Sequence, residues 1–365
     1  MSKTTLLRGT AITLGLAAFT VAGLSASPPS QGRTTPPPPK RAVAAPNPTV
    51  VEIPGGSGGV RFDDLQYSSL LGKLLLPAGK TGDLDLVDPH TLAVTAISGF
   101  STGSAGKHRW GEGTTSVDEG AGFLFASDRT TRTVKVVDPA SKKIVASAPL
   151  ASGPDYVRYV APTREIWVTE PGAEQIELFR LPEGKAPTPV HEAIISVPGG
   201  PESLVIDAQR GLAYVNLWKD QTLAIDLHKR TIVSRWPNGC EGSRGLALDA
   251  PDGRLFVGCA EGGASVLDVA HGGKVLDHLK AGEGVDIIAY DPVLRHLYVP
   301  GARSATLSIL GVSTTGKLSL LGTFPTEKGC HGVAAAGGRA FVPDPHGGRL
   351  LVIADPYPPA LRSPG

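Results

Sequence analysis

Short apolar runs separated by turn residues recur along the chain, and the pattern is clearest between Gly199 and Trp236. Each run is rich in β-branched or aromatic residues, which predicts β-strands. The four runs of this stretch are Leu204–Ile206, Leu212–Val215, Thr222–Ile225 and Ile232–Trp236. Four strands this short cannot bury both faces of their own sheet, so the unit has to stack on copies of itself.

The copies are found by aligning the second apolar run of each unit on Tyr214. The matching positions are Leu75, Phe125, Trp167, Phe256, Tyr298 and Phe341. Successive steps are 50, 42, 47, 42, 42 and 43 residues. A four-stranded unit that recurs at this period is typical of a β-propeller blade. The pattern therefore predicts an all-β, seven-bladed β-propeller of four-stranded blades over residues 50–358.

The repeat also resembles a known family. Leu297-Tyr298-Val299 shows its apolar triplet, and Phe125 to Pro139 shows the short turn followed by a strand that ends in Val-Asp-Pro. This pattern resembles the YVTN-type (YncE-like) β-propeller repeats of bacterial secreted and surface proteins, over essentially all of residues 50–358. The sequence departs from the pattern at Arg180 and Gly311, where the repeat carries the strand-ending Asp. The resemblance implies the fold, and it says little about activity because propellers serve many purposes.

The two ends of the repeat region predict how the ring closes. The seventh unit stops at its third strand, Leu350–Ala354, and lacks a fourth. The segment Val50 to Gly56 matches Ile195 to Gly200, which is a fourth strand leading into a new blade. We expect Val50–Ile53 to supply the outer strand of the last blade, which removes the open end of the array.

The N-terminal region has the features of a secretory signal peptide over residues 1–27. Lys3 and Arg8 precede an uncharged apolar stretch, Ala11–Leu24, and small residues follow. An uncleaved N-terminal anchor is the alternative interpretation. Residues 28–49 are rich in proline and predict an extended linker, and 359–365 form a C-terminal tail. We therefore expect a secreted or extracytoplasmic protein, in the periplasm or at the cell surface, with no membrane insertion after cleavage.

The charge balance limits the classes of partner. The chain has a formal net charge of +1, and 19% of its residues are charged. Bulk charge therefore favours neither nucleic acid nor an acidic membrane surface. We expect a monomer whose partner is a protein, a glycan or a small molecule.

Ionisable residues recur where the first strand of each blade is expected to start. In a propeller this strand lines the central channel, and the loops that enter it share one face, here named the top face, with the loops that join strands two and three. The position twelve residues before each aligned residue is occupied by Asp63, Gly113, Asp155, Glu202, Arg244 and Asp286, and a shorter hairpin brings His331 to the same place in the last blade. If these side chains point inward, they form an acidic ring at one mouth of the channel. Local turn bonding is the competing interpretation.

Such a ring suits a hard cation such as Ca²⁺, or a cationic or hydroxyl-rich ligand. Two functions follow. The first is a binding or interaction module that works through its top face and channel mouth. The alternative is a metal-assisted hydrolase or lactonase, in which Asp155, Glu202 and Asp286 hold the cation and His331 accepts the proton.

Other top-face residues extend this picture. The longest loop, from Gly99 to Gly113, carries His108, Arg109 and Trp110, and is either a lid over the mouth or a surface insertion. A further set lies at the ends of the second strands, where we expect turn bonding. Its members are Asp128, Glu170, Asn216 and Asp344.

Three cysteines complete the candidate chemistry. Cys240 and Cys259 fall along one edge of the fifth unit, which predicts a disulfide between them. Cys330 is expected to be a half-buried free thiol. The more specific alternative is that Cys330 and His331 form a catalytic or metal-binding pair. Adjacent residues of a strand point to opposite faces, so these two side chains are not expected to act on one atom.

Overall fold

A computed structural model describes residues 47–102 and 113–360. The predicted signal peptide, most of the predicted linker, the predicted lid residues His108, Arg109 and Trp110, and residues 361–365 lie outside the described residues. Within the described residues, no helix is long and apolar enough to cross a membrane.

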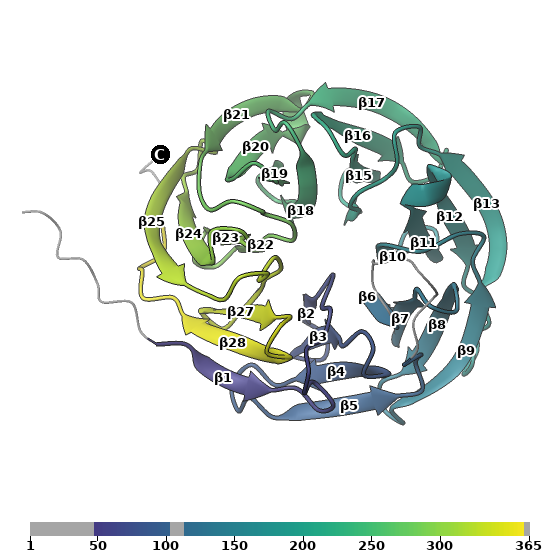
Figure 1. Cartoon of the computed structure of the whole chain (residues 1–365). Helices are drawn as coiled ribbons and strands as arrows, with labels where there is room; N and C mark the ends of the chain where they lie inside the picture. Colours follow the sequence, from purple (N-terminus) through teal and green to yellow (C-terminus); the bar gives the residue numbers. More distant parts are fainter. Residues whose placement is uncertain (1–46, 103–112, 361–365) are drawn as a thin grey trace, which may run out of the picture. The chain divides into compact units, whose positions relative to one another are not determined.

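The described chain forms seven four-stranded antiparallel sheets, one for each blade, arranged in a ring (Figure 1). The first three blades are β2 (Gln66–Ser68), β3 (Lys73–Pro77), β4 (Asp83–Val87) and β5 (Val94–Ser98); β6 (Thr114–Gly120), β7 (Phe123–Asp128), β8 (Thr133–Asp138) and β9 (Lys143–Pro149); and β10 (Val157–Val160), β11 (Glu165–Glu170), β12 (Gln175–Arg180) and β13 (Val190–Ser196).

The next three blades have the same order. They are β14 (Val205–Asp207), β15 (Leu212–Asn216), β16 (Gln221–Asp226) and β17 (Thr231–Pro237); β18 (Ser243–Asp249), β19 (Arg254–Cys259), β20 (Ala264–Asp268) and β21 (Lys274–Leu279); and β22 (Ala289–Asp291), β23 (His296–Gly301), β24 (Thr306–Val312) and β25 (Leu318–Pro325). Two short 3-10 turns, η1 (Pro171–Ala173) and η2 (Val269–His271), join strands at the blade ends.

The seventh blade closes the ring with strands from both ends of the described chain. It consists of β26 (Ala334–Ala336), β27 (Arg339–Asp344), β28 (Arg349–Ala354) and β1 (Thr49–Glu52). β1 pairs antiparallel with β28, with Val51 opposite Leu350. The innermost strands contact one another in the cyclic order β2, β6, β10, β14, β18, β22, β26 and back to β2. The predicted closure is confirmed, with the outer strand shifted by one residue.

The aligned position of the repeat is the centre of the core. Its occupants, Leu75, Phe125, Trp167, Tyr214, Phe256, Tyr298 and Phe341, are at most 1% exposed. Each lies in the second strand of a blade and is covered by the neighbouring blade. Phe125, for example, stacks on Tyr159 of the next blade with ring centroids 5.4 Å apart. Because burial of such a side chain stabilises by about 1.5–3 kcal/mol, the blades hold one another in place and fix the positions of the top loops.

Candidate functional site

The structure gathers five of the predicted ring residues around one cavity of about 470 Å³ at the mouth of the channel. Asp63, Asp155, Glu202, Arg244 and Asp286 all line it. We name this the mouth cavity. The backbone of two ring residues is fixed by the ends of the second strands, because the Asp155 amide donates to Thr169 O and the Glu202 amide donates to Asn216 O. Five of the first-strand starts therefore lie around one cavity.

Blade two contributes to the mouth cavity in a different way. Its ring position is Gly113, which has a φ of +69°, and a Cβ there would lie 2.1 Å from Gly79 O. A side chain is thus excluded at this position. Arg129, from the turn after β7, fills the gap, and its amide donates to Gly113 O at 2.8 Å.

Arg129 ties two of the ring carboxylates together. Its Nη2 donates to Asp155 Oδ1 at 2.5 Å and to Asp63 Oδ2 at 3.2 Å, and its Nε donates to Pro154 O at 2.8 Å. Sequence reasoning missed this residue. The available signal was that blade two alone lacks an ionisable residue at the ring position, while an arginine directly follows Asp128 on the same face.

Burial and mutual repulsion shift the acids of the mouth cavity toward their neutral forms. Burial raises the pKa of Asp63 to about 6, with Arg129 opposing it and Asp286 adding to it. Burial raises the pKa of Asp155 to about 8, against the lowering effect of Arg129. The pKa of Glu202 is raised well above its usual range by burial and then by Asp155 and Asp286. The fully ionised acids would outnumber the cations of the cavity, and protonation of the buried carboxyls relieves this imbalance.

Glu202 is the least satisfied of these acids. It is 4% exposed, and its Oε2 has no hydrogen-bond partner among the described residues. The nearest cation is Arg244, whose Nε lies 3.6 Å from Oε1, beyond hydrogen-bond distance. The guanidinium of Arg244 instead stacks on Trp218, 4.7 Å from the ring centroid.

Trp218 forms an exposed aromatic wall of the mouth cavity. It is 44% exposed although it is a large apolar side chain. Sequence reasoning did not single it out. Its place two residues after Asn216, at the top end of β15, was the signal that could have found it.

His331 lies beside the mouth cavity and joins the last blade to the segment that enters the first. Nδ1 lies 2.7 Å from Gly329 O, and Nε2 lies 3.0 Å from Phe62 O. Two carbonyl acceptors favour the doubly protonated ring. Burial lowers the pKa of His331, but Asp286 and the Gly329 carbonyl outweigh it and raise the pKa overall. An imidazolium held in this way is a poor proton acceptor.

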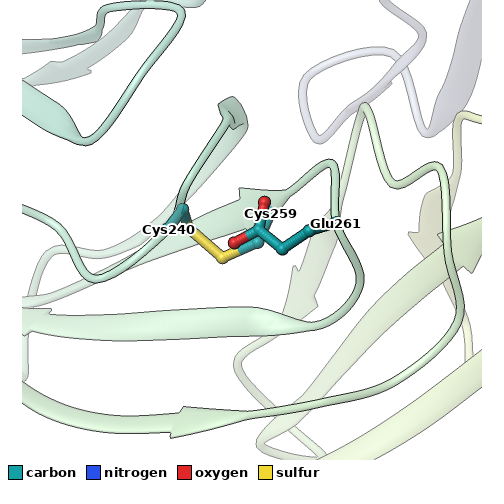
Figure 2. Close-up of side chains that lie close together, drawn as sticks. All are labelled: Cys240, Cys259 and Glu261. Atoms are coloured by element: carbon teal, nitrogen blue, oxygen red, sulfur yellow. A yellow bond between two sulfur atoms is a disulfide. The ribbon is translucent and has the colours of Figure 1, made fainter.

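The carboxylates of the mouth cavity are spread around it. Among the described residues, one set of three His, Cys, Asp or Glu side chains has ligand atoms within 4.8 Å of one another: Cys240, Cys259 and Glu261. Asp155, Glu202 and Asp286 do not meet this spacing. The Cys240–Cys259–Glu261 set offers no thiolates, because its two sulfurs are bonded to each other (Figure 2).

The Cys240–Cys259 disulfide is confirmed, with Cα atoms 5.2 Å apart. It joins the loop that enters β18 to the end of β19, next to Arg244. Glu261 accepts hydrogen bonds from the amides of Glu241 and Gly242, which holds the same loop. Cys330 is fully buried rather than half-buried, and burial raises its thiol pKa to about 11.

The polar residues at the ends of the second strands brace the top loops, and three of the four bond to other loops rather than only within the expected turn. Asp128 accepts hydrogen bonds from the Ser101 amide and hydroxyl, and Glu170 accepts one from the Ser152 amide. Asn216 donates to Arg244 O, and Asp344 accepts from the amides of His346 and Gly347. All four are buried.

An ion pair lies deeper in the channel. Arg158 donates from Nη1 and Nη2 to the two carboxylate oxygens of Asp64, at 2.6 and 3.0 Å. Both residues line a second cavity of about 500 Å³, together with apolar side chains such as Leu246 and Ile287. Tyr156 lines both cavities.

Comparison with known proteins supports the fold. No protein-family model and no curated protein matches the chain. Among solved structures, a chain of the mitotic checkpoint complex is similar with a TM-score of 0.70 and 12% identity, covering 94% of this chain and 99% of that one. Hydrazine synthase of Kuenenia stuttgartiensis gives a TM-score of 0.65 and 15% identity, covering 81% of this chain and 95% of that one. The Cps50 (Swd1) propeller domain of Myceliophteria thermophila gives 0.65 and 13%, covering 81% and 97%. At these identities the likeness shows a β-propeller and leaves function open.

Proposed function

We propose that the protein is a secreted binding module of the YVTN propeller type, and that its ligand occupies the mouth cavity. The observation that carries this proposal is the partnerless Oε2 of Glu202 in a cavity lined by three further carboxylates, counting only the residues that the structure describes. Buried polar atoms are normally satisfied, so such a group marks a place where a partner is expected. The volume of about 470 Å³ suits a small ligand or a side chain of a partner protein.

Three observations support an extracytoplasmic location. The disulfide indicates an oxidising environment. Residues 1–27 carry the pattern of a secretory signal peptide, and the repeat resembles secreted and surface proteins. β-Propellers commonly serve as interaction scaffolds, which fits a binding role.

The metal-assisted hydrolase or lactonase fits this geometry less well. Its three metal candidates, Asp155, Glu202 and Asp286, do not gather within 4.8 Å of one another, whereas ligand atoms around one Ca²⁺ converge at about 2.3–2.6 Å from the ion. Its expected base, His331, places both ring nitrogens against carbonyl oxygens.

A thermal-shift panel tests the binding function. Wild-type protein and the Glu202→Gln variant are heated with amines, disaccharides and Ca²⁺ or other divalent ions. We expect at least one class to raise the melting temperature of the wild type by about 2 °C or more, and to leave the variant unchanged. If no class shifts the wild type, or if every shift is equal in both proteins, the mouth cavity is not a binding site.

A further inference from the structure

We propose that the group bound in the mouth cavity is a primary ammonium, which takes the place of the Arg244 guanidinium beside Glu202 and lies along Trp218. This inference rests on the proposed binding function and specifies its ligand. The ammonium is carried either by a small amine or by a lysine of a partner protein, and the experiment below separates these sources.

The balance of charge points to a cationic ligand. The mouth cavity is lined by four carboxylates, Asp63, Asp155, Glu202 and Asp286, and by two guanidiniums, Arg129 and Arg244, while the His331 imidazolium beside it faces Asp286 and Asp63. Arg129 is engaged with Asp63 and Asp155. Glu202 is left with Arg244 at 3.6 Å and with an Oε2 that has no partner among the described residues. A bound cation stabilises the ionised form of these carboxyls, whereas a neutral sugar would leave their ionised form unbalanced and an anion would repel it.

The spacing of the acids points to an organic ion. Inorganic cations need several ligand atoms around one point, and the carboxylates of this cavity do not provide that spacing. An ammonium on a carbon chain instead offers three donors at one end and an apolar stem, so it needs one or two nearby acceptors and a surface for the stem. Glu202 provides the acceptor oxygens, and Trp218 provides the apolar surface for the stem.

Arg244 shows that this wall accepts a cation. Its guanidinium stacks on Trp218, and Nη1 donates to the Ser243 carbonyl at 2.8 Å, while no direct hydrogen bond to Glu202 is formed within the described residues. The side chain is held by the Ser243 carbonyl, by a long bond from Nη1 to Trp218 O at 3.5 Å and by the cation–π contact, and it is 24% exposed. Because Glu202 Oε2 has almost no accessible surface, an incoming donor reaches it only when a neighbouring side chain moves. Arg244 lies beside Glu202 and is the side chain that would move. The ammonium of the ligand then replaces the guanidinium of Arg244 as the cation next to Glu202.

Trp218 also provides the readout. The fluorescence of the mature domain is titrated with 1,5-diaminopentane, with Nα-acetyl-lysine methylamide and with the neutral isostere 1,5-pentanediol. The same titrations on Trp218→Phe isolate the signal of this one indole. Glu202→Gln removes the charge and keeps the shape, and Glu183→Gln, an exposed acid outside the mouth cavity, is the matched control.

We expect a saturable Trp218 signal with the amines and none with the diol. The apparent affinity should weaken about tenfold or more in Glu202→Gln and stay unchanged in Glu183→Gln. A stronger response to the diamine indicates a small-molecule source, and a stronger response to the lysine derivative indicates a partner side chain. Circular dichroism and urea unfolding check that the variants fold.

Three results overturn the proposal, and they differ in what they leave standing. If disaccharides or Ca²⁺ bind at the mouth cavity and the amines do not, the ammonium assignment is wrong and the binding function stands. If the amines bind equally well to Glu202→Gln, they bind elsewhere. If no class of probe binds, the binding function fails as well.

Discussion

The guanidinium of Arg129 bonds to the carboxylate of Asp155 on the next blade, with Nη2 and Oδ1 2.5 Å apart. The same nitrogen reaches Asp63 at 3.2 Å, so one arginine from blade two links blades one and three across the mouth cavity. This arrangement is possible because Gly113 leaves the ring position of blade two without a side chain. The acidic mouth is therefore held together by a cation from a different loop.

Replacing Arg129 with methionine should lower the free energy of unfolding by about 2–3 kcal/mol at pH 8, because two carboxylates lose their charged hydrogen bonds. Urea unfolding measures this change. The matched control is Arg303→Met, since Arg303 and Glu283 form an exposed pair at 3.9 Å that should contribute about 0–1 kcal/mol. Adding Asp155→Asn to Arg129→Met should recover part of the loss. Equal losses in the two single variants would contradict the bridging role.

Binding of an amine should strengthen as the pH rises from about 6 to about 8. The pKa of Asp63 is raised to about 6 and that of Asp155 to about 8, in both cases chiefly by burial, so each carboxyl is neutral at lower pH and cannot attract a cation. The charged groups around them are Arg129, Asp64, Asp286, Glu202 and His331. Calorimetry in two buffers should detect the release of up to about one proton per site when the amine binds. The affinity should then rise by up to about tenfold per pH unit. An affinity that is flat between pH 5 and pH 9 would contradict this linkage.

Asp85 should destabilise the folded protein. It lies on β4 with no exposed surface, and neither carboxylate oxygen has a partner within residues 47–102 and 113–360. Burial, followed by Asp83, raises its pKa to about 7. A raised carboxyl pKa means that the folded state holds the proton more tightly, so stability falls as the pH rises from about 4 to about 7.

Leucine is the natural replacement, because Leu223 and Leu351 occupy the same register position in blades four and seven. Asp85→Leu should raise the free energy of unfolding by roughly 3 kcal/mol at pH 8 and by less at pH 4. Chemical denaturation at the two pH values measures the difference. A variant that is less stable than the wild type at both values would show that Asp85 has a role that the described structure does not reveal.

Thiol counting tests the cysteine assignments. The native protein should give no reaction with a thiol reagent, because Cys330 is fully buried with a pKa raised to about 11 and the other two cysteines are bonded. Denaturation should expose one thiol, and denaturation with reduction should expose three. The Cys240→Ala, Cys259→Ala variant should lose about 3 kcal/mol of stability, since the disulfide spans 19 residues. Three thiols without reduction would contradict the disulfide.

The repeat pattern predicted the propeller and its closing strand, and it pointed to five residues that line the mouth cavity, because the hydrophobic positions fix strand register, and register fixes where each first strand starts. The pattern did not predict Arg129 or Trp218. These residues belong to turns, whose reach depends on backbone geometry that a periodic pattern does not encode. The role expected for His331 depended on its side-chain direction, and that direction follows from the carbonyls of Gly329 and Phe62. Burial of Cys330 likewise depends on tertiary packing.

The most direct test of the account is a crystal structure of the mature domain grown with 1,5-diaminopentane near pH 8. We predict an ammonium nitrogen at about 3 Å from Glu202 Oε2, with the Arg244 guanidinium displaced and the carbon chain against Trp218. An empty mouth cavity with Arg244 still beside Glu202, at an amine concentration that saturates the fluorescence signal, would contradict the central claim.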